Sequence, residues 1–156
     1  MKQNSTVKEQ SLNPQPAVRS KPQAETCETV RDERVCAALH AAGEKKAIDP
    51  VVLDLREIAS FTDYFVIVSG ANERQVQAIS DEVYETLKKA GHAALRVEGY
   101  KTAEWILLDY GDFVVHVFEQ KARKFYDLER LWRESKRVEL PAEFSADSGG
   151  SLRRES

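Results

Sequence analysis

The stretch that decides the fold runs from Glu98 to Gln120 and reads EGYKTAEWILLDYGDFVVHVFEQ. Two apolar runs, Trp105–Leu108 and Phe113–Phe118, flank the short polar unit Asp109–Asp112. Both runs are aliphatic, β-branched or aromatic and too short for a typical helix, so both are predicted to be strands. The Asp and Gly residues between them favour a tight hairpin turn.

The first of these runs is apolar on both faces of the predicted strand. Successive side chains of a strand point to opposite faces, so Trp105 and Leu107 lie on one side and Ile106 and Leu108 on the other. One side is expected to be covered by helices of the same chain. The other side is covered either by more of the chain or by a binding partner, and the second alternative is the basis of the functional hypothesis.

The rest of the chain alternates between helical and strand-like patterns. Helices are predicted over residues 29–43, 72–91 and 122–136, with Thr29 and Asn72 as N-caps. Further strands are predicted over residues 51–55, 64–68 and 93–97. A helix links the second and third strands, which are therefore expected to be parallel, while the hairpin adds an antiparallel part. The predicted fold class is α/β or α+β, with a mixed five-stranded sheet and covering helices.

Length and composition indicate one domain between two polar tails. The chain has 156 residues, and residues 1–28 and 139–156 carry few large apolar side chains, so we expect disordered tails around a domain at residues 29–138. A formal net charge of -3 argues against a protein that coats nucleic acid. Residues 54–119 hold twelve acidic and six basic side chains, a local net charge of -6, which favours a basic partner.

Cysteine usage and hydropathy bear on metals, cofactors and location. Cys27 and Cys36 form no C-x-x-C motif, so neither structural zinc nor a disulfide framework is expected, and two isolated thiols fit a reducing compartment. No apolar run approaches the ~20 residues that a membrane-spanning helix needs. The N-terminus lacks the apolar core of a signal peptide. We therefore expect a cytoplasmic protein with no cofactor, no metal and no membrane contact.

Residues that could carry catalysis are better explained by structural roles. Asp81 and Glu82 point about 100° apart on a predicted helix, so they do not form the paired-carboxylate magnesium platform of a nucleotidyltransferase. Asp109 and Asp112 flank a glycine, which is typical of a turn. His116 lies in mid-strand with no evident nucleophile beside it. We expect no enzyme.

Several sequence blocks follow one another in a specific order and spacing over residues 31–133. In chain order they are TDYFVI at 62–67, Gly70, Asp81, Glu98-Gly99, WILLDYGDFVVHVF at 105–118, Arg123 and FYDLERLW at 125–132. This set of blocks resembles the ribosomal silencing factor family, also called the iojap family.

The resemblance implies both a fold and a function. The implied fold is that of a catalytically inactive nucleotidyltransferase. The implied function is binding to the large ribosomal subunit through its ribosomal protein fourteen, which blocks joining of the small subunit and represses translation. The resemblance also implies a homodimer, and a protein target requires no direct sequence-specific binding of nucleic acid.

Five residues are predicted to contact this partner. Trp105, Leu108 and Tyr110 are the expected apolar anchors, while Asp109 and Glu98 are expected to pair with lysine or arginine side chains. Strand alternation places Trp105 opposite Leu108 and Tyr110. Either the strand bulges or twists near Ile106–Leu107, or one of the three anchors is wrongly chosen.

Two other functions stay open from the sequence. One is a nucleotidyltransferase-like enzyme whose carboxylates pair in an unrecognised way. The other is an RNA-binding ribosome assembly factor, because the last predicted helix is rich in basic residues: Lys121, Arg123, Lys124, Arg130 and Arg133. The same helix also carries acidic residues, which favours a solvated face of mixed charge.

Overall fold

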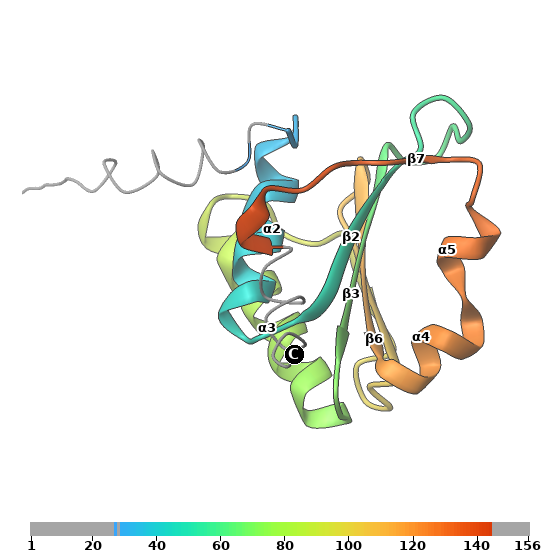
Figure 1. Ribbon diagram of the computed structural model, residues 1–156. Helices are drawn as coiled ribbons and strands as arrows, with labels where there is room; N and C mark the ends of the chain where they lie inside the picture. Colours follow the sequence, from blue (N-terminus) through green and yellow to red (C-terminus); the bar gives the residue numbers. More distant parts are fainter. Residues whose placement is uncertain (1–26, 28, 145–156) are drawn as a thin grey trace, which may run out of the picture.

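The computed structural model describes residue 27 and residues 29–144. They form one mixed sheet with helices on both of its faces (Figure 1), which confirms the predicted fold class. The strand order is β4-β5-β6-β3-β2-β7. The strands are β2 (Ile48–Asp54), β3 (Tyr64–Gly70), β4 (Arg96–Glu98), β5 (Trp105–Asp109), β6 (Phe113–Glu119) and β7 (Lys136–Arg137).

The helices divide between the two faces of the sheet. They are α2 (Glu33–Glu44), α3 (Glu73–Lys89), α4 (Gln120–Tyr126) and α5 (Leu128–Leu131). The longer pair, α2 and α3, covers one face, and the short pair, α4 and α5, lies against the other (Figure 1). None of the described helices is long and apolar enough to cross a membrane.

The centre of the sheet is the parallel pair β3 and β6. Every residue of β3 and the first six of β6 are buried, as expected for central strands that are covered on both faces. β4 runs in the same direction as β3 but lies at the edge, with β5 and β6 between them. Its three residues are all exposed, and Val97 is the one apolar side chain among them, so this short strand is suited to the edge of the sheet rather than to its buried centre.

The sheet has six strands where five were predicted, because the last predicted helix ends early. Asp127 adopts a left-handed conformation with φ 48°, which separates α4 from α5. The chain then forms β7 against β2 instead of continuing as helix to Lys136. The break also divides the predicted apolar stripe: Leu128 is buried against the sheet, whereas Phe125 and Leu131 are exposed.

Of the two predicted N-caps, one is confirmed and the other is wrong. The side chain of Asn72 accepts a hydrogen bond from the backbone N–H of Gln75 at 2.8 Å and caps α3 as predicted. α2 begins at Glu33, where Asp32 accepts from the N–H of Arg34 at 2.9 Å. The predicted cap, Thr29, lies three residues before the actual one.

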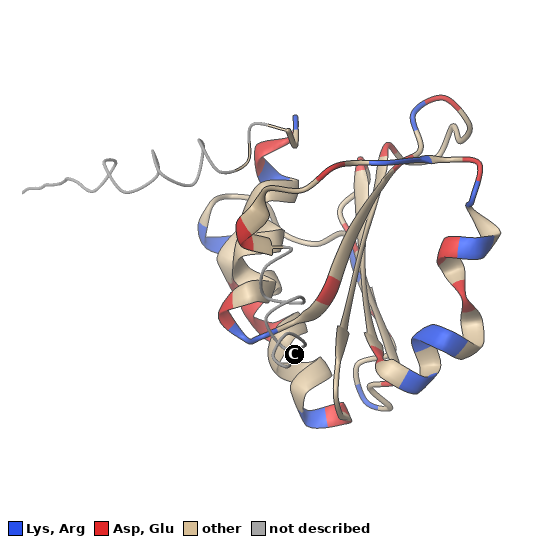
Figure 2. Cartoon of the chain, in the orientation of Figure 1, with Lys and Arg blue, Asp and Glu red and all other residues tan. Residues whose placement is uncertain are grey.

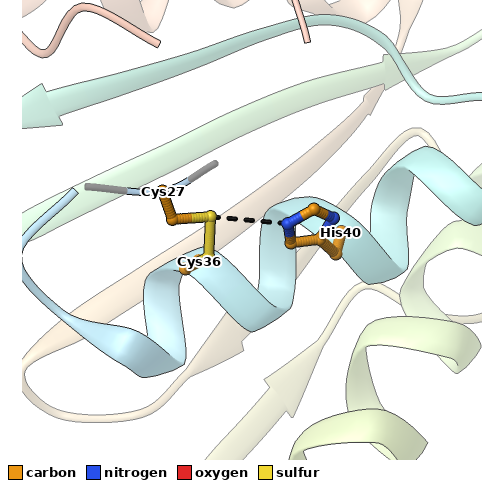
Figure 3. Close-up of side chains that lie close together, drawn as sticks. All are labelled: Cys27, Cys36 and His40. Carbon is orange, nitrogen blue, oxygen red and sulfur yellow. Dashed lines mark hydrogen bonds between the residues drawn. A yellow bond between two sulfur atoms is a disulfide. The ribbon is translucent and has the colours of Figure 1, made fainter. Parts of the chain in front are cut away.

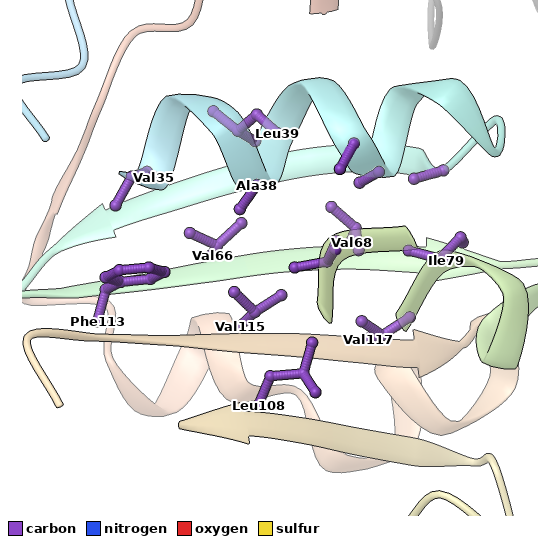
Figure 4. Close-up of a cluster of buried hydrophobic side chains, with 14 of the residues drawn as sticks. Val35, Ala38, Leu39, Val66, Val68, Ile79, Leu108, Phe113, Val115 and Val117 are labelled. Atoms are coloured by element: carbon purple, nitrogen blue, oxygen red, sulfur yellow. The ribbon is translucent and has the colours of Figure 1, made fainter. Parts of the chain in front are cut away.

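Two hydrophobic clusters lie on opposite sides of the sheet. The larger one packs the sheet against α2 and α3, and Figure 4 shows Leu108 of β5 in it, with Val115 and Val117 of β6. The smaller one packs the other face against α4 and α5 around Phe65, Phe118 and Leu128. Partly buried residues complete the smaller cluster: Ala59, Trp105, Leu107 and Trp132.

The cysteines depart from the prediction of two isolated thiols. Cys27 and Cys36 form a disulfide, with their Cα atoms 5.8 Å apart. The disulfide joins Cys27 to the first turn of α2, across a sequence separation of nine residues. The packed structure also extends past residue 138, because Phe144 is buried and its ring lies 5.1 Å from that of His40. The remainder of the predicted tails lies outside the described residues.

His116 is a buried polar residue on the α4 and α5 side of β6. Its Nδ1 accepts a hydrogen bond from the indole N–H of Trp105 at 3.0 Å, and the ring of Phe65 lies edge-on at 4.5 Å. Burial lowers the pKa of His116 to about 3, against a smaller opposing effect of Asp109. The imidazole is therefore neutral at physiological pH and acts as an acceptor that fixes the indole.

The loop between β4 and β5 depends on Gly99. Its φ is +82°, and an added Cβ would overlap the carbonyl oxygen of Trp105. Gly91 has a similar φ of +93° but open space around it. We predict that Gly91→Ala costs about 1 kcal/mol of unfolding free energy through strain alone, whereas Gly99→Ala costs about 3 kcal/mol. Urea unfolding of both variants measures the difference, and equal costs would contradict the close approach of the loop.

A second prediction concerns acid stability. An unfolded chain protonates His116 near its ordinary pKa of 6.5, whereas the folded chain does not until about pH 3. Falling pH between these values therefore favours unfolding, by about 1.4 kcal/mol per pH unit. His116→Gln keeps an acceptor for Trp105 and removes this slope, which denaturant titrations from pH 7 to pH 5 measure. The exposed control His92→Gln retains the slope; identical slopes in both variants would contradict the assignment.

Candidate docking face on β4 and β5

Regular alternation along β5 sorts the five predicted contact residues into two groups. Trp105, Leu107 and Asp109 share one face of β5. Glu98 of β4 lies on the same face, because it is the cross-strand partner of Leu107. Leu108 and Tyr110 point to the opposite face, toward α2 and α3. The register of β5 with β6 is continuous, so no bulge brings the two groups together.

Leu108 and Tyr110 do not reach the surface that they were expected to form. Leu108 is 1% exposed and Tyr110 is 7% exposed. The Tyr110 ring stacks on Phe113 at 4.9 Å, and burial raises the pKa of its hydroxyl to about 12. Both side chains belong to the core beneath the long helices, which corrects their selection as exposed anchors.

Trp105 is half-buried and held in a fixed orientation. Its ring stacks on Phe118 at 4.9 Å, contacts Tyr126 of α4 at 4.9 Å, and donates its N–H to His116. The indole therefore has its polar atom satisfied inside the protein and presents apolar ring surface outward. A rigid aromatic side chain of this kind loses little entropy when a partner binds.

Exposed apolar residues extend this surface beyond the predicted set. Leu107 is half-buried on the same face as Trp105, and Tyr126 and Phe125 continue it along α4, with their rings 5.0 Å apart. Alternation with Trp105 could have identified Leu107 from the sequence. The exposure of Phe125 could not be predicted from the sequence, because it depends on the helix break at Asp127. We define the docking face as Glu98, Trp105, Leu107, Asp109, Phe125 and Tyr126.

The two carboxylates of the docking face share one internal cation. Arg96 lies 3.2 Å from Glu98 and 3.3 Å from Asp109. Asp109 also accepts the N–H of Gly111 at 2.9 Å through its other oxygen, so it stabilises the turn as predicted. The ion pairs are largely exposed and weak, so a basic group on a partner can replace Arg96 at low cost.

Charge near the docking face is mixed. Figure 2 shows acidic positions spread over the sheet and helices, while α4 beside the docking face is mainly basic. Arg123 of α4 is committed internally, because it pairs with Glu129 and donates to Ser69 at 2.9 Å. Lys121 and Lys124 are the exposed bases of this helix.

Among the described residues, one cluster of three or more potential metal ligands is found, at Cys27, Cys36 and His40, and it lies on the α2 side. Asp81 is on α3, where it accepts a hydrogen bond from the hydroxyl of Tyr100 at 3.1 Å. The docking face itself offers apolar contacts and exchangeable ion pairs, which are features of a protein-binding surface.

The chain resembles one family of known proteins. The family described as "Ribosomal silencing factor during starvation" matches residues 28–155. A ribosomal silencing factor of Halalkalibacterium halodurans is 43% identical over 103 residues, covering 66% of this chain and 88% of the relative. The chloroplastic protein Iojap of Zea mays is 36% identical over 101 residues, covering 65% of this chain and 44% of that protein.

Two solved structures are similar to this chain in both fold and sequence. A crystal structure from Chromobacterium violaceum has a TM-score of 0.64 and 33% identity, covering 69% of this chain and 89% of that one. A crystal structure from Bacillus halodurans has a TM-score of 0.63 and 42% identity, covering 69% and 98%. The chain described here therefore belongs to the ribosomal silencing factor family.

Proposed function

We propose that this protein binds the large ribosomal subunit through ribosomal protein fourteen, blocks joining of the small subunit and thereby represses translation. The observation that carries the proposal is the docking face: a fixed, half-buried Trp105 on β5, next to the edge strand β4, where the short helices cover β5 only in part and all residues of β4 are exposed. The names of the relatives, which include ribosomal silencing factors and a mouse protein of mitochondrial large-subunit assembly, support a ribosomal target.

Occlusion is the mechanism that this geometry suits. A rigid sheet edge with an aromatic centre and a charged border can form an interface of ~800 Å² on each partner. Glu98 and Asp109 would exchange Arg96 for lysine or arginine side chains of ribosomal protein fourteen. The body of the domain would then occupy space that the small subunit needs, so repression requires no catalysis.

The remaining proposals concern the state of the free protein. It would be cytoplasmic and homodimeric.

Two competing functions are disfavoured. An enzyme of the nucleotidyltransferase type needs two carboxylates on one strand to hold magnesium, whereas Asp81 and Glu82 lie on helix α3. An RNA-binding role is disfavoured because Asp127, Glu129 and Glu134 interrupt the basic stretch, and Glu129 also engages Arg123.

The faces of β5 can be tested against each other. Trp105→Ala is predicted to weaken binding to purified large subunits by about 2–4 kcal/mol, because it removes the central aromatic anchor. Leu108→Ala is predicted to lower the unfolding free energy by about 2–5 kcal/mol but to leave the affinity of the folded protein unchanged. Fluorescence anisotropy gives the affinity, and denaturant unfolding gives the stability.

Leu107→Lys is the second variant, because it adds charge to the docking face without removing the contacts of Trp105. It should also weaken binding while the fold remains intact. Unchanged affinity in both Trp105→Ala and Leu107→Lys, with each protein folded, would place the binding site elsewhere.

Order of addition tests occlusion itself. Incubation of large subunits with the protein, before small subunits are added, is predicted to lower the fraction that sediments as joined ribosomes. Trp105→Ala should restore joining. If the protein instead co-sediments with joined ribosomes as well as with free large subunits, occlusion is not how it acts.

A further inference from the structure

The cluster of Cys27, Cys36 and His40 lies at α2 and the segment before it (Figure 3). The docking face lies on the other side of the sheet, with α4 and α5. Cys36 and His40 are four residues apart in α2, so their side chains project from the same side of the helix. Cys27 comes from the preceding segment and is bonded to Cys36. The ligand atoms of all three residues lie within 4.8 Å of one another.

We propose that reduction of the Cys27–Cys36 disulfide creates a Zn²⁺ site in which both thiolates and Nε2 of His40 are ligands. Two sulfurs and one imidazole nitrogen form a donor set that zinc prefers. Nε2 of His40 lies 3.4 Å from the sulfur of Cys27. Tetrahedral zinc with ordinary bond lengths separates a sulfur and a nitrogen ligand by about 3.6 Å, so this pair is already close to the required geometry.

The environment of His40 provides a second, independent indication of a metal site. Its other ring nitrogen, Nδ1, lies 3.5 Å from a carboxylate oxygen of Glu143. Zinc-bound histidines generally donate this second N–H to a carboxylate or carbonyl, which orients the ring and fixes the tautomer. Glu143 is thus a positioning residue rather than a ligand. The cluster has three ligand residues among the described part of the chain, and a water molecule or another side chain would complete the tetrahedron.

The chemistry balances with a dithiol as reductant. One protein S–S bond breaks and one S–S bond forms in the reductant, with transfer of two hydrogens to Cys27 and Cys36. Zinc then displaces the two thiol protons, which go to solvent, and both thiolates bind the metal. The disulfide sulfur has no proton, so Nε2 donates to it in the oxidised form; in the metal form the proton resides on Nδ1, facing Glu143.

The metal would hold together three segments of the chain. The ring of His40 packs against Phe144, and both Cys27 and Phe144 are buried. The disulfide and the zinc ion are therefore alternative cross-links at the same position, the first under oxidising conditions and the second under reducing conditions. This inference does not rest on the proposed ribosomal function, because the site and the docking face lie on opposite sides of the sheet.

The test uses the full chain, free of affinity tags, reduced with a dithiol and transferred to anaerobic buffer. Titration with Zn²⁺ against a chromophoric chelator, and metal content after gel filtration, should give one zinc per chain. Co²⁺ should give the thiolate charge-transfer and visible bands of a tetrahedral sulfur site. The oxidised chain should bind neither metal, and re-reduction should restore binding.

Variants separate the ligands from the positioning residue. Cys36→Ser and His40→Gln should abolish stoichiometric binding, and Glu143→Gln should weaken it about 10–100-fold. His92→Gln, at a helix end elsewhere, is the matched control and should bind as the wild type does. Cys27→Ser should also lose zinc binding. Because Cys27 lies outside the helices, that loss cannot be attributed to disruption of a helix.

Hydrogen exchange supplies a readout other than affinity. Zinc should slow exchange of amides at residues 30–32 and 142–144 in the reduced protein. The proposal is overturned if the reduced chain binds no stoichiometric zinc, if Cys27→Ser or Cys36→Ser binds it undiminished, or if the oxidised chain binds it equally well.

Discussion

The alternation of side chains along β5 is the constraint on which the rest of the structure depends. It directs Ile106 and Leu108 into the core beneath α2 and α3, and it directs Trp105 and Leu107 to the side of the short helices. The long helices seal the first side. The break at Asp127 leaves the second side incompletely covered, and that unequal coverage produces the docking face.

Two polar residues make the unequal coverage stable. Buried His116 accepts the indole N–H, so Trp105 can present ring surface without an unsatisfied donor. Arg96 neutralises Glu98 and Asp109 at the edge, so the acidic border is stable before a partner arrives. In the proposed docking, this surface would therefore need little reorganisation.

Much of the architecture follows from local signals that the sequence displays directly. The hairpin turn and the Asn72 cap are dictated by spacing over a few residues. Features that depend on distant packing were not predictable. The place of β4 at the edge, the contact of Cys27 with Cys36 and the break at Asp127 depend on surfaces that meet only in the folded chain. For the same reason Leu108 and Tyr110 were selected as anchors although the helices bury them.

The most direct test of the docking face is photo-cross-linking from position 107 in the presence of large ribosomal subunits. A photoreactive residue in place of Leu107 lies at the centre of the docking face, and one in place of Glu33, exposed at the start of α2, serves as the control. Position 107 is predicted to cross-link to ribosomal protein fourteen, and position 33 is not. Cross-linking from position 33 but not from 107 would contradict the account.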